Sequence, residues 1–208
     1  MYKKIIKFCF ISLISVLFIA IFIVFMTGDA QLIQTKLNHI EQRALENKTT
    51  DWDRFWLRLL YQNMIFFGQF HYPNASKMLH HYCQQKSDTL FFDAENLYKE
   101  NPEVKFAVDN NKTGVIFRPH HIEDIMLHIS PVFYWDLYYA FDVLSIKKEG
   151  NSVVLYDKYK FNTIETKVYT HFKIGQISLE INDGLIKVAY PKAKGFISYG
   201  KFEILTSK

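Results

Sequence analysis

The stretch LYYAFDVLSIKKEGNSVVLYDKYKF, residues 137–161, decides the fold that we expect for this chain. It contains two runs rich in β-branched and aromatic residues, 137–147 and 153–161, on either side of a short polar segment. Gly150 and Asn151 lie at the centre of that segment and tolerate the positive φ that a tight turn requires. The pattern therefore predicts an antiparallel β-hairpin.

Short apolar runs continue after this hairpin, at 167–174, 177–181 and 196–205. Asn182-Asp183-Gly184 supplies a further turn signal. Residues 177–189 fit either a second hairpin or one helix, and their spacing does not separate the two. We expect the C-terminal third to form an antiparallel β-sheet.

Helical patterns precede this sheet. Ile33, Leu37, Ile40 and Ala44 recur at spacings of three and four, which predicts a stalk helix over 31–46. This helix could pair with a second copy of the chain or pack on the following domain, and its length of under two heptads favours packing on the domain. A second helix is expected from an N-cap at Asp51 to about Phe67, with Gly68 ending it and Trp52, Phe55, Trp56, Leu59, Leu60 and Asn63 on its apolar face. A third is expected around 75–83, and the two would form a helical hairpin.

The middle of the chain has shorter signals: an extended segment at 89–92, a weak helical turn at 94–99, an ambiguous run at 104–108, a turn at 109–112, a strand at 114–118 and helical spacing at 120–129. Helices that precede a sheet, rather than alternating with its strands, indicate the α+β class.

The N-terminal run Phe8–Met26 contains no charged residue, no Gly and no Pro. As a helix its 19 residues would be roughly 28 Å long, which is close to the thickness of a bilayer core. Lys3, Lys4 and Lys7 precede the run, so the N-terminus is expected in the cytosol and the rest outside it. The sequence predicts a signal-anchor at 1–28, a helical stalk at 29–50 and one extracytoplasmic domain at 51–208.

A cleaved signal peptide is the alternative for this N-terminal segment. Gly28-Asp29-Ala30 fits a small-residue cleavage site, and cleavage near Ala30 would yield a secreted protein. The apolar run is longer than the usual signal-peptide core, which favours the inner-membrane anchor. The chain has two cysteines, Cys9 within the apolar run and Cys83. A disulfide framework is therefore excluded, and we expect the Cys83 thiol to be buried.

The charge is divided unevenly along the chain. Residues 143–208 contain 11 lysines and 6 acidic residues. This excess could face an anionic surface such as lipid headgroups, a cell-wall polymer or an acidic protein, or it could be a solvated face of the sheet. No Arg-rich stripe with interleaved aromatic residues is present, so we expect no nucleic-acid partner.

Two groups of residues are candidates for chemistry. If residues 120–129 are helical, His120, Asp124 and His128 lie on one face at the spacing that can hold a divalent metal. The aromatic stretch 133–142 includes Asp136, which could bind a sugar through its carboxylate and the neighbouring rings. The same aromatic residues could instead form a β-strand in the core. No sequence motif indicates a bound cofactor.

Asp157-x-Tyr159-x-Phe161-Asn162 resembles the C-terminal domains of bacterial secreted toxin-like proteins of the colicin M type, which attack lipid-linked cell-wall precursors. In that family an Asp-x-Tyr-Asp motif is followed, after five residues, by His-Arg. Here Lys160 replaces the second Asp, and Thr166 and Lys167 stand in place of His and Arg. The family's activity is therefore not carried over, and Asp157 with Tyr159 could equally be a hydrogen-bonded pair that fixes the sheet.

These patterns favour a single-pass membrane protein whose outer domain mediates interaction or scaffolding in the cell envelope, with a protein partner. The alternative is an envelope-directed hydrolase or toxin-like effector that uses Asp157, Tyr159 and Asp136. The chain lacks a Gly-x-Ser-x-Gly elbow, a phosphate-binding glycine loop and a dinucleotide fingerprint, which favours the interaction protein.

Overall fold

The computed structural model describes residues 30–117, 131–141, 143–174 and 177–204. The expected membrane anchor Phe8–Met26 and the expected metal ligands His120, Asp124 and His128 lie outside these residues. Within the described ranges, no helix has the length and apolar character needed to cross a membrane.

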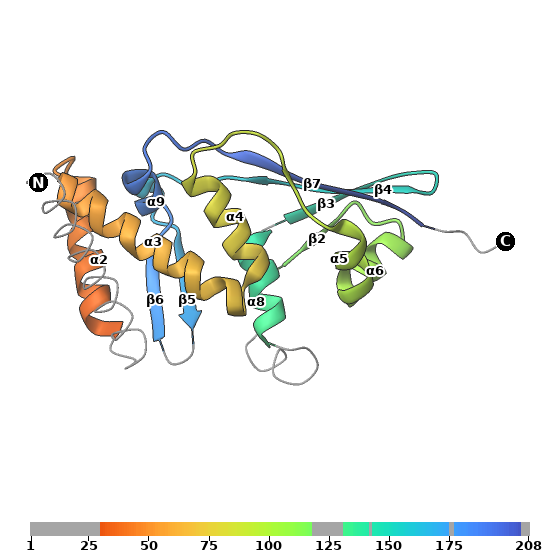
Figure 1. Ribbon diagram of the computed structural model, residues 1–208, viewed down its shortest axis with the longest axis horizontal. Coiled ribbons are helices and arrows are strands. Elements are labelled where there is room, and N and C mark those ends of the chain that lie inside the picture. Colours follow the sequence, from red (N-terminus) through yellow and green to blue (C-terminus); the bar gives the residue numbers. More distant parts are fainter. Residues whose placement is uncertain (1–29, 118–130, 142, 175–176, 205–208) are drawn as a thin grey trace, which may run out of the picture. The chain divides into compact units, whose positions relative to one another are not determined.

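The fold is α+β, with helices first and most strands later, as the sequence predicts (Figure 1). Its residues cluster into two compact units. Unit 1 contains the described residues of 1–67 and 161–191, and unit 2 contains those of 68–160 and 192–208. The chain thus leaves unit 1, builds most of unit 2, returns to unit 1 and finishes in unit 2.

Helix α2 (Ala30–Leu45) provides one layer of unit 1, and its buried residues are the four predicted from the sequence: Ile33, Leu37, Ile40 and Ala44. It packs on strand β6 (Ile177–Asn182), on the short helix η1 (Ile164–Thr166) and on helix α9 (Leu185–Ala189). The expectation that this helix packs on the folded domain is confirmed.

The other layer of unit 1 contains a two-stranded hairpin of β5 (Tyr169–Ile174) and β6. Two strands alone are marginally stable in water, so the cover by α2 is needed. The side-chain amide of Gln34 on α2 also binds the outer edge of β6, donating to the Glu180 carbonyl and accepting from the Glu180 N–H, both at 2.9 Å. Residues 177–189 therefore combine both alternatives, a hairpin strand followed by a short helix.

The N-terminus of α3 (Asp51–His71) is capped by Thr50, not by Asp51 as predicted. Thr50 Oγ1 accepts from the Asp53 N–H at 3.1 Å, and the Asp53 carboxylate accepts from the Thr50 N–H at 3.0 Å. Arg43 of α2 binds the same carboxylate through two nitrogens. Burial raises the pKa of Asp53, but these hydrogen bonds outweigh burial and lower the pKa to about 2.

Helix α3 continues through Gly68 to His71, so the prediction that Gly68 ends it is wrong. A Cβ at Gly68 would lie 2.3 Å from the Ser76 hydroxyl of α4 (Pro73–Cys83), so this glycine serves close packing within unit 2. The predicted apolar face of α3 is confirmed only in part, because Leu60 and Asn63 are buried as predicted whereas Phe55, Trp56 and Leu59 are half-buried. Trp52 is exposed, and the buried hydrophobic residues are Leu57, Leu60, Tyr61 and Met64.

The sheet of unit 2 has five strands in the order β1-β7-β4-β3-β2. Strands β3 (Val143–Glu149) and β4 (Ser152–Tyr159) form the predicted hairpin, with Glu149 opposite Ser152 and a φ of 61° at Gly150 in the turn. Strand β7 (Phe196–Glu203) pairs antiparallel with β4. The expected antiparallel sheet needs one correction, because β1 (Leu90–Phe91) pairs with β7 in parallel and makes the sheet mixed.

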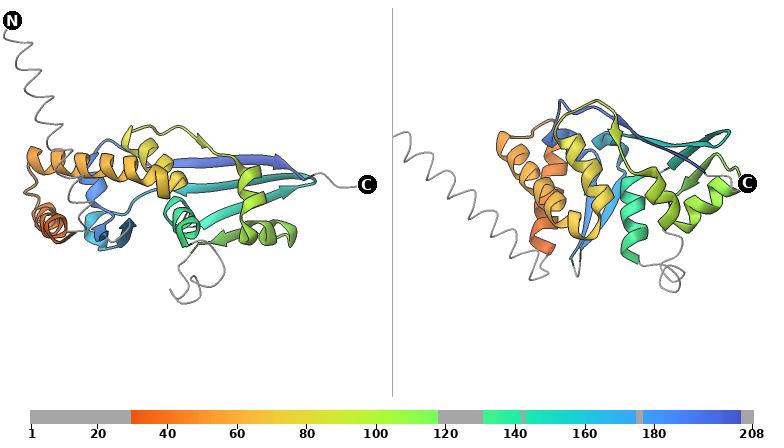
Figure 2. Two further views of the ribbon diagram at one scale, coloured as in Figure 1. Left: turned by 60° about the horizontal axis from the view of Figure 1, so that its bottom comes forward. Right: turned by 45° about the vertical axis from the view of Figure 1, so that its right-hand side comes forward.

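Helices of unit 2 cover one face of this sheet: α5 (Ala94–Glu100) and α6 (Pro102–Asp109) lie on the same side in both views of Figure 2. The absence of a side chain at Gly200 lets α5 approach β7, because a Cβ there would be 2.6 Å from the Ala94 Cβ. Cys83 is buried in α4, as predicted.

The aromatic stretch before the hairpin forms helix α8 (Pro131–Ala140), so the expected strand at 137–147 begins only at Val143. Pro131 starts the helix, and no Gly or other Pro interrupts it. Its buried positions Asp136, Leu137 and Ala140 follow helical spacing, and α8 packs on α4. Aromatic β-propensity is therefore overridden by packing in this segment.

Candidate functional site

A recess in the described part of unit 2 lies between helix α6 and strand β2 (Gly114–Ile116). Helix α6 is fixed at its start by Asn101, whose side-chain oxygen accepts from the Val104 N–H at 2.8 Å. Pro102 follows as the first helical residue, a position where its missing N–H costs nothing. The ambiguous run 104–108 is thus a helix with a well-defined start.

The end of α6 leads directly into β2 through a tight turn. Asn111 adopts a left-handed conformation with a φ of 53°. The Asn111 N–H donates to the Val108 carbonyl and the Lys112 N–H donates to the Ala107 carbonyl, which is the pattern of a Schellman motif. The turn predicted at 109–112 is confirmed, and it places Lys112 at the mouth of the recess.

Strand β2 forms one edge of the five-stranded sheet among the described residues. It pairs with β3 only on one side, with Val115 opposite Leu144, and the Ile146 N–H donates to the Thr113 carbonyl. In an antiparallel pair, backbone groups of alternate residues point toward and away from the partner strand. The N–H and C=O groups of Gly114 and Ile116 therefore point away from β3.

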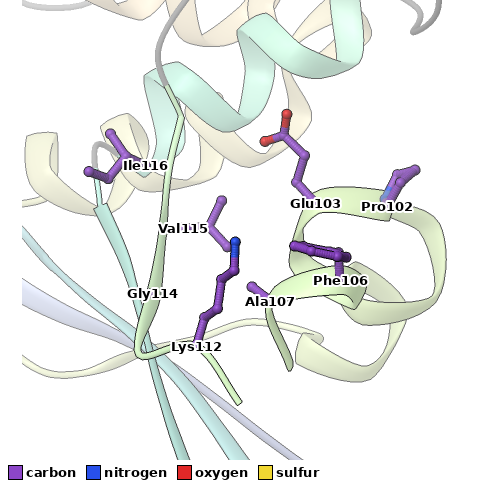
Figure 3. Close-up of a pocket in the computed structure, with 8 residues that line it drawn as sticks. All are labelled: Pro102, Glu103, Phe106, Ala107, Lys112, Gly114, Val115 and Ile116. Atoms are coloured by element: carbon purple, nitrogen blue, oxygen red, sulfur yellow. The ribbon is translucent and has the colours of Figure 1, made fainter. Parts of the chain in front are cut away.

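The recess, which we call the edge groove, has a volume of about 400 Å³. It is lined by all three consecutive residues of β2 together with α6 and the turn (Figure 3). Because β2 is the edge strand of the sheet, the groove between β2 and α6 lies beside that edge. In Figure 3 the Phe106 ring extends from α6 toward β2, and Val115 points into the space between them.

The edge groove is mostly apolar and has one residue of each charge. Phe106 is 55% exposed and Ile116 is 51% exposed, whereas Val115 and Ala107 are buried in its floor. Lys112 Nζ lies 4.5 Å from the centre of the Phe106 ring, a cation–π geometry. Glu103 lines the groove from the first turn of α6. The groove therefore offers backbone groups, an apolar floor and two opposite charges.

Asp136, a sequence-predicted site residue, is buried in α8 and acts as a cap for another helix. Its carboxylate accepts from the Asn74 and Ala75 N–H groups at 3.1 and 2.8 Å, and from the Asn74 side chain at 2.8 Å. Burial raises the pKa of Asp136 more than these hydrogen bonds lower it. The carboxylate thus satisfies the N-terminus of α4 and is not presented to solvent.

Asp157 and Tyr159 lie on β4, in a different setting. Asp157 Oδ1 accepts from the Lys158 N–H at 2.7 Å. The Tyr159 ring stacks on Phe196 of β7 with centroids 5.0 Å apart and meets Tyr82 of α4 edge-on. These contacts place Tyr159 in the packing between the sheet and α4.

The third predicted group, His120, Asp124 and His128, lies outside the described residues. Within the described part of the chain, no three His, Cys, Asp or Glu side chains are grouped as they would be around a metal ion.

Comparisons with known proteins found no matching family model, no matching curated protein and no matching solved structure.

Sequence reasoning did not identify the edge groove, although it identified its parts. The turn at 109–112 and the strand at 114–118 are both visible in the sequence, but the position of β2 at a sheet edge is not. That position depends on the pairing of β2 with β3, nearly 30 residues further along the chain. Phe106 and Lys112 acquire their place only through this pairing.

Proposed function

We propose that this chain is an interaction protein tethered to a membrane, and that unit 2 binds an extended segment of a partner protein along β2. The observation that carries this proposal is the edge groove, an apolar recess beside the outward-pointing backbone groups of Gly114 and Ile116. Extended peptides commonly bind in this way, as an added strand whose alternate side chains enter pockets.

The dimensions of the groove support a peptide ligand. Its volume of about 400 Å³ lies at the lower end of the range of ligand pockets, enough for one or two apolar side chains. The backbone groups of Gly114 and Ile116 would pair with the peptide backbone, and Phe106 would cover its apolar side chain. Affinity would then come from main-chain hydrogen bonds and specificity from the floor of the groove.

The charges at the groove suggest which peptides fit best. Lys112 follows the turn before β2, and Glu103 belongs to the first turn of α6. A bound segment that carries an acidic residue near Lys112 would form a charge-assisted contact. We therefore expect an extended apolar peptide with an acidic residue, and not a small polar substrate.

The predicted catalytic carboxylate supports this non-catalytic function. All three hydrogen bonds to Asp136 come from the start of α4, so its carboxylate already has a structural task. The tether in this proposal is Phe8–Met26, whose length and lack of charge suit a bilayer span. Anchoring the chain would keep the groove close to partners in the same membrane.

The test is selection of peptides on the full chain in detergent, from a displayed library of random octapeptides, followed by binding measurements on synthetic peptides. The key variants are Ile116→Pro and Ile116→Ala. Ile116→Pro removes an N–H that points away from β3, so the sheet keeps its pairing while the edge loses a donor. Ile116→Ala shortens the side chain and keeps that donor, which makes it the matched control.

We expect selected peptides to bind the parent chain and Ile116→Ala, and to lose about tenfold in affinity on Ile116→Pro, the equivalent of one well-formed hydrogen bond. Phe106→Asp should weaken binding further, because it places a charge beside the apolar floor. Peptides that bind equally to the parent and to both Ile116→Pro and Phe106→Asp would exclude the edge groove as the binding site.

A further inference from the structure

We propose that the outer face of the unit 2 sheet docks on an anionic phospholipid surface. By outer face we mean the side chains of β1, β3, β4 and β7 that point away from α5 and α6. Its apolar and aromatic members that reach solvent are Phe91, Val143, Tyr156, Ile197 and the half-buried Tyr199. This inference does not depend on the edge groove, because these five residues do not line it.

Strand alternation defines this face. Val153 and Leu155 of β4, with Phe196, Ser198 and Phe202 of β7, are buried on the inner side. The residues between them point to the outer side, where Tyr156 is 41%, Ile197 48% and Phe91 66% exposed. Single exposed apolar residues are common, but several gathered on one face of a sheet indicate an interaction surface.

An aromatic row crosses the middle of the outer face. Tyr156 of β4 stands opposite Tyr199 of β7, which in turn stands opposite Phe91 of β1. The Phe91 and Tyr199 rings meet edge-on with centroids 5.9 Å apart. Tyrosine is enriched where proteins meet the interface of a bilayer, because its ring is apolar and its hydroxyl is polar.

Four lysines lie at or just beyond one end of this face, and two more, Lys147 and Lys201, stand on the face toward its other end. Lys158 stands opposite Ile197, and Lys160 follows β4, where a Cβ on Gly195 would be 3.3 Å from the Lys160 Cβ. Lys192 and Lys194 lie in the segment that joins α9 to β7. Lys158, Lys160, Lys192 and Lys194 are all exposed, and we call these four the basic end.

The acidic residues of the outer face lie at its opposite end, next to Lys147 and Lys201. Glu149 and Glu203 flank Ser152 in the register of the sheet, and Glu149 pairs with Lys147 at 2.5 Å. Asp157, next to the basic end, alternates to the inner side of β4. Residues 161–191 hold as many acidic as basic side chains, so the lysine excess of the C-terminal third belongs to the residues of unit 2.

The combination of lysines and exposed apolar residues selects a lipid surface as the occupant. Long lysine side chains can lay their stems along apolar surface and place their ammonium groups among phosphates. The aliphatic side chains of Val143 and Ile197 suit the boundary between headgroups and acyl chains. Positive charge at the basic end matches the negative charge of the lipid, which is the complementarity that holds peripheral proteins on anionic membranes.

The experiment measures how quickly a maleimide labels Ile197→Cys in the full chain, with the label on Cys9 and Cys83 subtracted. The chain is mixed with nanodiscs of phosphatidylcholine alone or with added phosphatidylglycerol. We expect labelling to slow by about fivefold or more with phosphatidylglycerol, since one lysine near an anionic surface contributes about that factor. High salt should reverse the slowing. Because the two compositions are compared with each other, the readout does not require Phe8–Met26 to insert.

Two charge variants with the same net change act as a matched pair. In the first, Lys158, Lys160, Lys192 and Lys194 are changed to Gln. In the second, Lys77, Lys86, Lys99 and Lys105, which lie on or shortly after the helices of unit 2, are changed to Gln. Only the first should abolish the protection of the thiol in Ile197→Cys by phosphatidylglycerol. Equal labelling in both lipid compositions, or equal protection in both variants, would overturn the proposal.

Discussion

Strand β6 in unit 1 and strand β2 in unit 2 both form a sheet edge, and the two edges differ in what binds their outward-pointing backbone groups. The edge of β6 is bound by the Gln34 amide of α2, which pairs with the Glu180 backbone much as a neighbouring strand would. No described strand pairs with the outer edge of β2, and an apolar groove lies beside it. Open edges tend to attract other chains, so proteins usually block them unless they are used.

The same contrast appears in the buried carboxylates of the two units. Asp53 in unit 1 is paired with Arg43 and caps its own helix. Asp136 in unit 2 has three hydrogen bonds from α4, all from uncharged groups. The first carboxylate has a lowered pKa and the second a raised one. In unit 1 the outer edge of β6 and the charge of Asp53 are thus both paired within the unit. In unit 2 no described strand pairs with the outer edge of β2, and no described charged side chain binds Asp136.

The largest expected effect comes from Asp136→Ala, which leaves the first turn of α4 without its acceptor. We expect the free energy of unfolding of unit 2 to fall by about 3 kcal/mol, the cost of losing several hydrogen bonds to a buried charged group. Hydrogen exchange should show faster opening of α4 and α8 and little change in α2. Asp157→Ala in the same unit is the control, with a much smaller effect; an equal effect would refute the capping role.

Asp53→Asn should have the next largest effect, this time in unit 1. Replacing the carboxylate removes the charge partner of Arg43, and the lowered pKa of Asp53 corresponds to about 2 kcal/mol at neutral pH. Urea unfolding with hydrogen-exchange detection on α2 and the start of α3 measures the loss. Asp51→Asn, at an exposed position in the same turn, should leave these segments nearly unchanged. A similar loss in both variants would contradict the Thr50 cap.

These carboxylates also show what the sequence can and cannot predict. The four buried residues of α2 and the turn at Gly150 follow from local spacing, and the sequence predicts them residue by residue. Thr50-x-x-Asp53 is a local capping pattern, yet Asp51 is also a plausible N-cap because it directly precedes the first aromatic residue. The role of Asp136 depends on α8 meeting α4 across some 60 residues, which no local pattern reveals.

The main error in the predicted fold concerns residues 131–140, which form a helix where the sequence favoured a strand. The dense aromatic residues of this segment favour a strand by propensity, and its hydrophobic pattern has no clear helical side. Packing against α4 decides the outcome, as tertiary contacts often do. The same limit explains why the sequence reveals neither the edge groove nor the outer face. Both are defined by strand order and by which helices cover the sheet.

A variant with a smaller expected effect tests whether the Gln34 side chain closes the outer edge of β6. Gln34→Ala should expose the Glu180 backbone and destabilise the β5–β6 hairpin by about 1 kcal/mol, since two partly exposed hydrogen bonds are lost. The Glu180 amide should exchange faster with solvent, as followed by NMR. Gln42→Ala, an exposed residue of the same helix, provides the control. Unchanged exchange at Glu180 would mean that the amide does not close this edge.

The smallest expected effect is a difference between the two units in how their stability changes in mild acid. A lowered pKa stabilises the fold above the ordinary value of 3.8, and for Asp53 that stability is lost as the pH falls toward about 2. By about pH 4 unit 1 should have lost only about 0.3 kcal/mol from this group. A raised pKa has the opposite effect on how stability changes with pH. Asp136 therefore stabilises unit 2 most when it is protonated, and its contribution to stability falls as the pH rises.

Exposed pairs such as Lys105–Asp109 and Lys147–Glu149 also titrate in unit 2, so the measurement must be a difference between variants. Hydrogen exchange, corrected for its intrinsic pH dependence, should show that Asp53→Asn removes the acid-induced loss in α2. Asp136→Asn should remove the acid-induced gain in α4 and α8. If both variants changed the pH profile in the same direction, the two carboxylates could not have opposite pKa shifts, and the electrostatic contrast between the units would fail even though the difference between their edges would stand.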